Sequence, residues 1–154
     1  QMLRAVAAIV NGGKLVTPHF GLYTSSSDGS VVNEFAYSTE EEAISSQTSE
    51  MMKQILEGVV SEGGGTKAYI EGYSIGGKTA TSQKLPRGSG KYISSFIGFA
   101  PADNPQVIAM CLIDEPTGVY YGGTIAAPVV KTLYENILPY IGIERAVQLE
   151  KNDD

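Results

Sequence analysis

The chain has 154 residues, a formal net charge of -6 at pH 7 and one cysteine. A chain of this length is typical of one domain with a substantial apolar core, so the fold needs neither a disulfide nor a metal. Nucleic acids bind basic patches, whereas Lys and Arg are scattered here among a larger number of acidic residues. We therefore expect no nucleic-acid partner, no metal and no cofactor.

The apolar runs are short. Residues 107–113 form one of the longest, far below the roughly 18 to 20 residues that a membrane span requires. The amino end lacks a signal-peptide pattern, so we expect the chain itself to be soluble. The sequence opens at Gln1 inside a helical pattern without a capping residue. We therefore expect a missing upstream segment, where a membrane anchor would lie.

The first part of the chain predicts a helix and a hairpin. Apolar residues recur every three or four positions over residues 2–10, which predicts a helix that ends at the glycines of residues 11–13. A turn signal at Asp28 and Gly29 predicts a small exposed hairpin within residues 21–35. Residues 39–42 have capping-box spacing and an acidic run that suits the helix dipole, so they predict a helix start.

The next elements alternate in type. Residues 46–61 predict a helix whose core stripe is Met52, Ile55, Leu56 and Val59, and glycines at 63–65 end it. Extended structure is predicted through residues 67–83 and again over 91–100, on either side of a loop rich in Pro and Gly.

A short connection then leads to residues 106–114, whose unbroken apolar run predicts a central strand covered on both faces. Two strands joined so briefly must be antiparallel. A final helix is predicted over residues 125–138, with Pro128 near its start and Pro139 at its end. Residues 144–154 are expected to form a charged, fraying tail.

Two single residues have simple interpretations. His19 is the one histidine of the chain, so no second histidine could join it in a catalytic or metal site, and we expect a surface or packing role. Cys111 lies within an apolar run, where a cysteine is more often a small buried hydrophobe than a reactive thiol. Neither residue predicts a function.

Residues 72–79 match the phosphate-loop pattern G-x-x-x-x-G-K-[ST], and residues 107–115 resemble the strand that holds magnesium in nucleotide hydrolases. A phosphate loop, however, joins a buried strand to a helix whose amides face the phosphates. The upstream flank is short and polar, and the downstream flank carries Pro86, Gly88 and Gly90 without a helical period. We keep a nucleotide hydrolase as the less favoured alternative.

An edge strand suits the same residues better. Alternation in a strand sends Lys78 and Ala80 to one face and Thr79 and Thr81 to the other. The backbone amides along an edge remain available to a ligand. A lysine and two hydroxyls suit a carboxylate, and an edge amide can donate to an oxyanion.

In this strand and several flanking segments the chain resembles the class B penicillin-binding proteins, the D,D-transpeptidases of bacterial cell-wall synthesis. The resemblance rests on residues 76–83, 92–102, 114–116 and 121–123, together with residues 11–13, Pro18 and residues 55–60. It implies a mixed α/β fold of the α+β type, with an antiparallel sheet of about three main strands packed by helices, within a β-lactamase/transpeptidase-like fold. Residues 1–154 would be the carboxyl-terminal half of the transpeptidase domain, carrying the last three of five strands.

The resemblance also implies roles for single residues. Lys78 would help hold the proton-transfer network. Thr79 and Thr81 would bind the terminal carboxylate of a D-Ala-D-Ala stem peptide or of a β-lactam, and the Thr81 amide would be one of two oxyanion donors. Ala80 stands where the family usually has glycine and adds a methyl group on the Lys78 face, so a narrower groove and an altered activity are expected.

The sequence contains no serine followed by lysine three residues later and no serine followed by asparagine two residues later. The nearest match to the serine-x-x-lysine pattern is Thr81 followed by Lys84, which has threonine in place of serine. We therefore expect the nucleophilic serine to lie in the missing amino-terminal half of the domain, and the chain alone to be inactive. The parent protein would act at the extracytoplasmic face of the bacterial membrane. A non-catalytic interaction module that docks a partner is the alternative from a different class.

Overall fold

The computed structural model describes residues 1–146, apart from the side chains of residues 40 and 41. The chain forms two compact units, Gln1–Met51 and a second unit that begins at Met52. Residues 147–154, which hold most of the expected charged tail, lie outside the described range. Among the described residues, none of the helices has both the length and the apolar character that crossing a bilayer requires.

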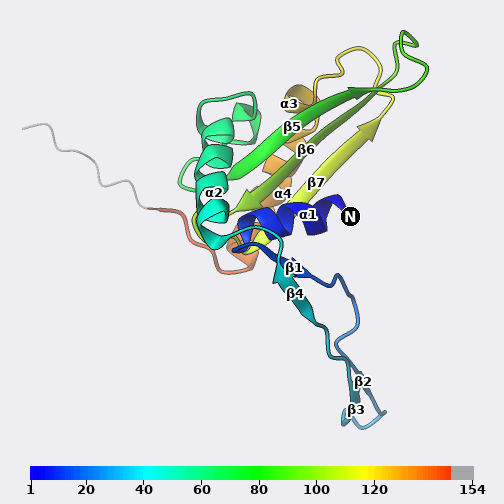
Figure 1. Cartoon of the computed structure of the whole chain (residues 1–154), viewed down its shortest axis with the longest axis vertical. Coiled ribbons are helices and arrows are strands. Elements are labelled where there is room, and N and C mark those ends of the chain that lie inside the picture. Colours follow the sequence, from blue (N-terminus) through cyan, green and yellow to red (C-terminus); the bar gives the residue numbers. More distant parts are fainter. Residues whose placement is uncertain (147–154) are drawn as a thin grey trace, which may run out of the picture. The chain divides into compact units, whose positions relative to one another are not determined.

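The first unit contains the predicted helix and hairpin. The helix α1 spans Met2–Val10 and ends before Asn11, as its periodicity predicted. Strands β2 (Tyr23–Ser25) and β3 (Val31–Glu34) pair in antiparallel fashion, which confirms the hairpin. Two extended segments connect this hairpin to a second antiparallel pair, formed by β1 (Lys14–Val16) and β4 (Thr39–Glu42) (Figure 1).

Residues 39–42 are a strand, so the predicted helix start at this position is wrong. Val16 lies opposite Thr39 in the β1–β4 pair, and this pairing overrides the local capping pattern. The helix α2 (Ser46–Ser61) begins later. Its cap is the Ser45 hydroxyl, which accepts a hydrogen bond from the Thr48 amide at 3.1 Å.

A buried serine links the start of α2 to the end of α1. The Ser49 side chain is fully buried. Its hydroxyl donates to the Ile9 carbonyl at 2.7 Å and accepts from the Gly12 amide at 3.0 Å. The turn that follows α1 is therefore fixed by a side chain some forty positions along the chain, and both its polar groups are satisfied.

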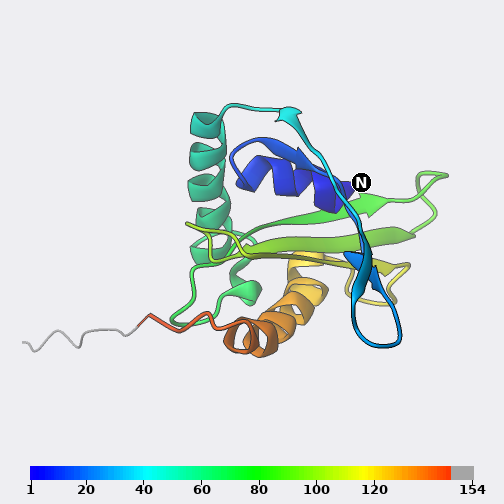
Figure 2. The same cartoon turned by 90° about the horizontal axis from the view of Figure 1, so that it is seen from below.

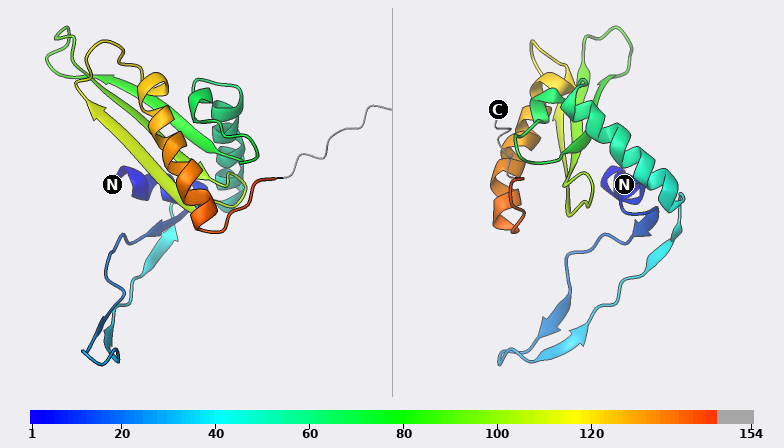
Figure 3. Two further views of the ribbon diagram at one scale, coloured as in Figure 1. Left: turned by 180° about the vertical axis from the view of Figure 1, so that it is seen from behind. Right: turned by 90° about the vertical axis from the view of Figure 1, so that its left-hand side faces the viewer.

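The second unit is built on a three-stranded antiparallel sheet. Its strands are β5 (Gly76–Gln83), β6 (Tyr92–Ala100) and β7 (Val107–Asp114), in the order β5-β6-β7. The helix α4 (Ala127–Tyr140) lies across one face of this sheet, after the short helix α3 (Gly122–Ile125) (Figures 2 and 3). A short 3-10 helix, Thr66–Ala68, packs beside α4. The predicted mixed fold with an antiparallel sheet is confirmed.

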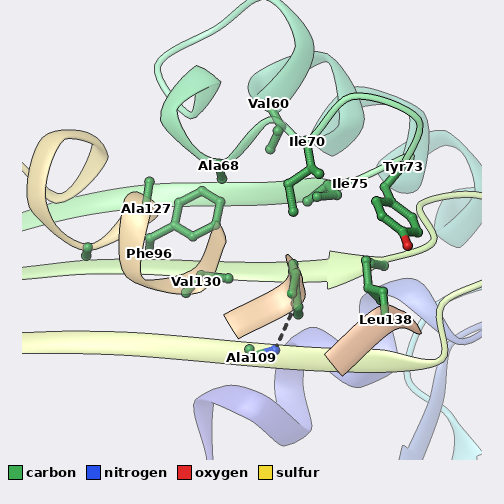
Figure 4. Packing of buried hydrophobic residues seen from close by; sticks show 13 residues of the cluster. Val60, Ala68, Ile70, Tyr73, Ile75, Phe96, Ala109, Ala127, Val130 and Leu138 are labelled. Carbon is green, nitrogen blue, oxygen red and sulfur yellow. Dashed lines mark hydrogen bonds between the residues drawn. The ribbon is translucent and has the colours of Figure 1, made fainter. Parts of the chain in front are cut away.

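The core of this unit lies between the sheet and α4. Phe96 of β6 and Val130 and Leu138 of α4 are almost fully buried there, with Ile70 and Ile75 beside them (Figure 4). Cys111 packs against this cluster as a half-buried free thiol, and burial raises its pKa.

A tyrosine hydroxyl is inserted at the β6–β7 pairing. Tyr134 is fully buried, and its hydroxyl donates to the Gly98 carbonyl and accepts from the Ala109 amide at 3.1 Å (Figure 4, dashed line). Because Gly98 and Ala109 are register partners, one side chain of α4 is tied to both strands. Burial raises the pKa of Tyr134, so the hydroxyl keeps its proton and remains a donor.

Three predictions in this unit need correction. Among the described residues β7 pairs with β6 alone and Leu112 is 55% exposed, so this chain does not cover β7 on both sides as predicted. Ile55 is 62% exposed, whereas Lys53 and Val60 are buried, so the buried stripe of α2 is rotated from the predicted one. Helix α4 continues one residue beyond Pro139.

The glycine pair at the start of β5 makes room for aromatic rings. A Cβ atom on Gly76 would lie 2.2 Å from the Phe99 ring, and one on Gly77 would lie 2.5 Å from the Phe96 ring and 2.7 Å from the Ile97 carbonyl oxygen. Phe99 lies directly opposite Gly76, and Phe96 lies two residues from Gly98, the partner of Gly77, so the two rings are on opposite faces of the sheet. These two glycines therefore make room for the rings of β6.

We predict that Gly77→Ala destabilises the second unit by about 1 to 3 kcal/mol, because the added methyl group meets a buried ring and a backbone oxygen. Urea denaturation measures this. The matched control is Gly58→Ala in α2, where nothing lies within 4 Å of the new Cβ. This control should gain about 0.5 to 1 kcal/mol from helix propensity. Equal stability of the two variants would contradict the packing role.

The tip of the β2–β3 hairpin predicts an unusual titration. The Ser26 hydroxyl and then the Ser30 amide and hydroxyl donate to the Asp28 carboxylate, and these bonds lower its pKa from 3.8 to about 2. The depressed pKa means that this carboxylate stabilises the turn above pH 3.8, and that the contribution is lost as the pH falls to about 2.

An NMR titration of the Asp28 carboxyl carbon should therefore show a midpoint near pH 2. Ser26→Ala should move the midpoint up towards 3.8, whereas Ser27→Ala, beside it in the turn, should not. A midpoint near 3.8 in the unsubstituted chain would show that the tip network does not form in solution.

Candidate functional site

Strand β5 leaves one of its backbone edges unpaired by another strand. Among residues 1–146 it pairs with β6 alone, in a register that places Ala80 opposite Ser95 and Thr81 opposite Ser94. Continuing the same register places Lys84 opposite Lys91, and there the Lys84 amide donates to the Lys91 carbonyl at 2.8 Å.

That bond decides which amides face outwards. In an antiparallel pair, alternate residues exchange their hydrogen bonds with the partner strand, and the residues between them direct their amides away. Because the backbone amide of Lys84 faces β6, the backbone amides and carbonyls of Ala80 and Lys78 face β6 too. Those of Thr79 and Thr81 face the outer edge. The predicted edge strand is therefore present, with the expected amides along its rim.

The side chains divide as the alternation predicted. Lys78 and Ala80 are exposed on one face of β5. The Lys78 ammonium donates to the Thr79 carbonyl at 2.9 Å, along the outer edge of the strand. Thr79 is half-buried and Thr81 is exposed on the other face, towards α3. The structure thus places a cation, a hydroxyl and two outward amides within one short stretch of strand.

Helix α3 orients the Thr81 hydroxyl. The Gly122 amide donates to the Thr81 side-chain oxygen at 3.0 Å. A Cβ atom on Gly122 would lie 2.3 Å from the carbonyl oxygens of both Ala80 and Ser95, and one on Gly123 would lie 2.4 Å from the Gly64 carbonyl oxygen. The two glycines thus let the start of α3 lie directly against β5 and β6, which is the signal that the Gly122–Gly123 pair carried in the sequence.

An ion-pair cluster ties the far end of β5 to the end of β7. The Lys84 ammonium lies 2.9 Å from the Asp114 carboxylate and 2.8 Å from that of Glu115, and the Lys91 ammonium lies 3.0 Å from Glu115. Hydrogen bonds to Glu115 and then Asp114 raise the pKa of Lys84, and those from Lys84 and then Lys91 lower the pKa of Glu115. The sequence gives no local signal for this cluster, because its two lysines and two carboxylates lie some thirty residues apart.

Stacked tyrosines hold the loop that leads into α3. The Tyr92 and Tyr120 rings are nearly parallel, with centroids 4.1 Å apart, and Tyr121 lies 4.7 Å from Tyr120. The buried Ser94 hydroxyl donates to the Tyr120 carbonyl. These contacts place residue 122 against β5, so they support the orientation of Thr81 indirectly.

The same geometry removes the phosphate-loop interpretation. Residues 78–81 are extended within an antiparallel strand, and no helix begins after them, so no helix amides are available to hold phosphates. Across the part of the chain that the structure describes, His, Cys, Asp and Glu side chains form no group able to hold a metal ion. In the first unit His19 stacks on Tyr37, with ring centroids 3.6 Å apart.

Comparison with known proteins gives one family. Residues 1–135 match the family described as the penicillin binding protein transpeptidase domain. The chain is similar to stage V sporulation protein D of Bacillus subtilis, with 40% identity over 98% of this chain and 24% of that protein. It is also similar to the probable peptidoglycan D,D-transpeptidase PenA of Neisseria flavescens, with 33% identity over 93% of this chain and 34% of that protein.

Solved structures agree with this result. Penicillin binding protein 3 of Mycobacterium tuberculosis, in complex with ampicillin, superposes with a TM-score of 0.80 and 27% identity, over 97% of this chain and 36% of that one. The D,D-transpeptidase domain of a peptidoglycan glycosyltransferase from Eggerthella lenta gives a TM-score of 0.78 and 27% identity, over 93% and 32%. The chain therefore spans about a quarter to a third of the proteins that it resembles.

We predict that Thr81→Val destabilises the second unit by about 1 to 3 kcal/mol, because it leaves the amide of the buried Gly122 without its acceptor. Thr81→Ser retains the oxygen and should lose much less. Urea denaturation of both variants measures the difference. If valine and serine at this position gave the same stability as threonine, the bond between α3 and β5 would not form in solution.

Proposed function

Because the chain belongs to the penicillin-binding protein transpeptidase domain family, we propose that it is the carboxyl-terminal half of a D,D-transpeptidase domain that cross-links peptidoglycan stem peptides. The observation that supports this proposal most is the edge of β5. There Lys78 and Thr81 accompany outward-facing amides that β6 does not use. Such an edge can bind an extended peptide whose end carries a negative charge.

The Thr81 hydroxyl suits a carboxylate because its oxygen already accepts a hydrogen bond and its proton remains free to donate one. A hydroxyl offers one proton and two lone pairs. The Gly122 amide uses the oxygen as an acceptor, so the proton is left to donate to a ligand on the exposed side. In this proposal Thr81, with Thr79 beside it, holds the carboxylate of a D-Ala-D-Ala stem peptide or of a β-lactam.

Lys78 has two roles in the proposal. Its ammonium is exposed next to the outer edge, where it attracts the anionic end of the substrate. It also takes part in the network through which the nucleophile loses its proton and the leaving group gains one. Its hydrogen bond to the Thr79 carbonyl keeps the ammonium along the strand that the substrate would follow.

The outward amide of Thr81 completes the proposed site. A backbone donor at a sheet edge cannot reorient, so it is already aimed at the oxyanion that develops during acyl transfer. We assign it as one of the two oxyanion donors. The other donor and the attacking serine belong to the part of the domain that this chain does not supply, since the sequence has no serine followed three residues later by lysine.

The reaction of the intact domain then has two steps. The serine hydroxyl attacks the carbonyl of the penultimate D-Ala, and the terminal D-Ala leaves with a proton, which gives an acyl-enzyme. An amine of a neighbouring stem peptide attacks this ester and releases the serine with its proton restored. β-Lactams such as ampicillin, bound by the solved relative, would acylate the same serine. The intact protein would work on the extracytoplasmic side of a bacterial membrane.

The first test is covalent labelling. The isolated 154-residue chain, incubated with a fluorescent penicillin and separated by denaturing electrophoresis, should show no fluorescent band at its 16.3 kDa mass. A longer protein that carries this chain together with a serine-x-x-lysine motif should be labelled. A fluorescent band from the isolated chain would place the nucleophile within it and contradict the proposal.

The second test removes Lys78 from that longer protein. We expect Lys78→Gln to lower the rate of acylation by penicillin about 10²-fold or more, through loss of charge attraction and of proton transfer. Stability should change by less than about 0.5 kcal/mol, because the side chain is exposed. Gln83→Ala, at the exposed end of the same strand, is the control and should acylate normally. Unchanged acylation in Lys78→Gln would remove Lys78 from the site.

A further inference from the structure

The β2–β3 hairpin of the first unit carries large apolar side chains in water. Six of them lie between 42% and 107% exposed: Phe20, Leu22, Tyr23, Val31, Val32 and Phe35. Single exposed apolar residues are ordinary, but a cluster of this kind within one short hairpin marks an interaction site. The proposed transpeptidase reaction does not use any of these residues.

Neither face of the hairpin lies on an apolar core of its own unit. In the part of the chain that the structure describes, β2 and β3 pair only with one another, and each retains an unpaired backbone edge. The register places Tyr23 opposite Glu34 on one face, while Leu22 and Phe35 lie on the other. The pairing shifts between Thr24 and Ser25, so Val32 has no partner in the ladder, and it is 68% exposed. Since both faces include exposed apolar side chains, the hairpin can contact a partner through a face and through an edge.

The shape of the hairpin is fixed before any partner arrives. Its tip is held by the bonds from Ser26 and Ser30 to Asp28. Near its base the Tyr37 hydroxyl donates to the Gly21 carbonyl at 2.7 Å, and the His19 ring stacks on Tyr37. A preformed surface loses less conformational entropy on binding than a flexible loop does.

The negative charge of residues 15–52, which include the hairpin, favours a positively charged partner. Residues 15–52 contain no Lys or Arg. They carry six carboxylates: Asp28, Glu34, Glu40, Glu41, Glu42 and Glu50. An anionic membrane surface and a second copy of the same region would both be repelled by this charge. A basic partner would be attracted to it.

One hollow on the hairpin combines the two properties. It is lined by Leu22, Tyr23, Glu34, Phe35 and Ala36, so one acidic residue lines it together with apolar residues from both faces of the hairpin. A Lys or Arg side chain matches this arrangement, because its aliphatic stem packs on apolar surface while its charged end reaches a carboxylate.

We propose that the β2–β3 hairpin is a docking surface for an extended, basic and apolar segment of another protein, which places a Lys or Arg side chain in the hollow beside Glu34. The segment adds to a hairpin edge through backbone hydrogen bonds, and its alternate side chains lie on the exposed apolar face. This surface would recruit a partner protein to the transpeptidase, and it does not depend on which chemistry that enzyme performs.

The test uses the whole chain and two fluorescent peptides, one alternating Val with Lys and the other alternating Val with Glu. Fluorescence anisotropy should show that the Val-Lys peptide binds, that added salt weakens this binding, and that the Val-Glu peptide does not bind. Glu34→Gln should weaken binding of the Val-Lys peptide about tenfold, which corresponds to about 1.4 kcal/mol. Equal binding of the two peptides, or absence of binding by both, would overturn the proposal.

A second variant tests the apolar contribution without removing the strand. Val32→Thr keeps a β-branched side chain of similar shape, so the hairpin should remain folded, and it should also weaken binding several-fold. Leu85→Thr, at a residue 83% exposed in a different loop, is the control and should bind normally. Equal losses in the two variants would show non-specific hydrophobic binding.

The two rejected occupants have tests of their own. In sedimentation, the unsubstituted chain and the Val32→Thr variant should both be monomeric. Vesicles of phosphatidylglycerol should not bind the unsubstituted chain more than they bind the Val32→Thr variant. Self-association that Val32→Thr abolishes would assign the surface to a second copy of the chain, and vesicle binding that Val32→Thr abolishes would assign it to a membrane. Either outcome would contradict the docking of a basic protein segment.

Discussion

The arrangement of this protein depends on the one-sided pairing of β5 with β6. The bond from the Lys84 amide to the Lys91 carbonyl sets the register of the pair, so Ala80 faces its neighbour and Thr81 faces the outer edge. A shift by a single residue would exchange these directions and would also move every side chain to the opposite face. Packing resists such a shift, because the Phe99 and Phe96 rings of β6 occupy the space that side chains at residues 76 and 77 would need. Only glycine fits at these two positions.

The strand alone would present a row of outward-facing backbone amides, and the neighbouring elements orient the Thr81 hydroxyl beside them. The start of α3 donates to the Thr81 oxygen, and glycine at residue 122 is what lets the helix come close enough. The tyrosine stack and the ion pairs of Lys84 hold the two loops that border this contact. The proposed carboxylate site is therefore an outcome of several packing contacts, most of them made by residues that would never touch a substrate.

Sequence reasoning succeeded where the signal is local and regular. The period of α1, the turn at Asp28 and the extended character of residues 78–81 were all readable, and the family resemblance led to the correct fold. It failed where pairing between distant segments decides the outcome. Thr39 joined a strand because it pairs with Val16, more than twenty residues earlier. The Lys84 cluster and the bond from Gly122 to Thr81 could not be foreseen for the same reason.

Amide hydrogen exchange, followed residue by residue by NMR, tests the central claim most directly. The amides of Lys78 and Ala80 should be protected, because they donate to β6, whereas those of Thr79 and Thr81 should exchange rapidly from the outer edge. This alternation would confirm that the rim faces outwards before any ligand is present. Protection of Thr79 and Thr81 together with rapid exchange at Lys78 and Ala80 would contradict the account, because the edge would then present the wrong residues.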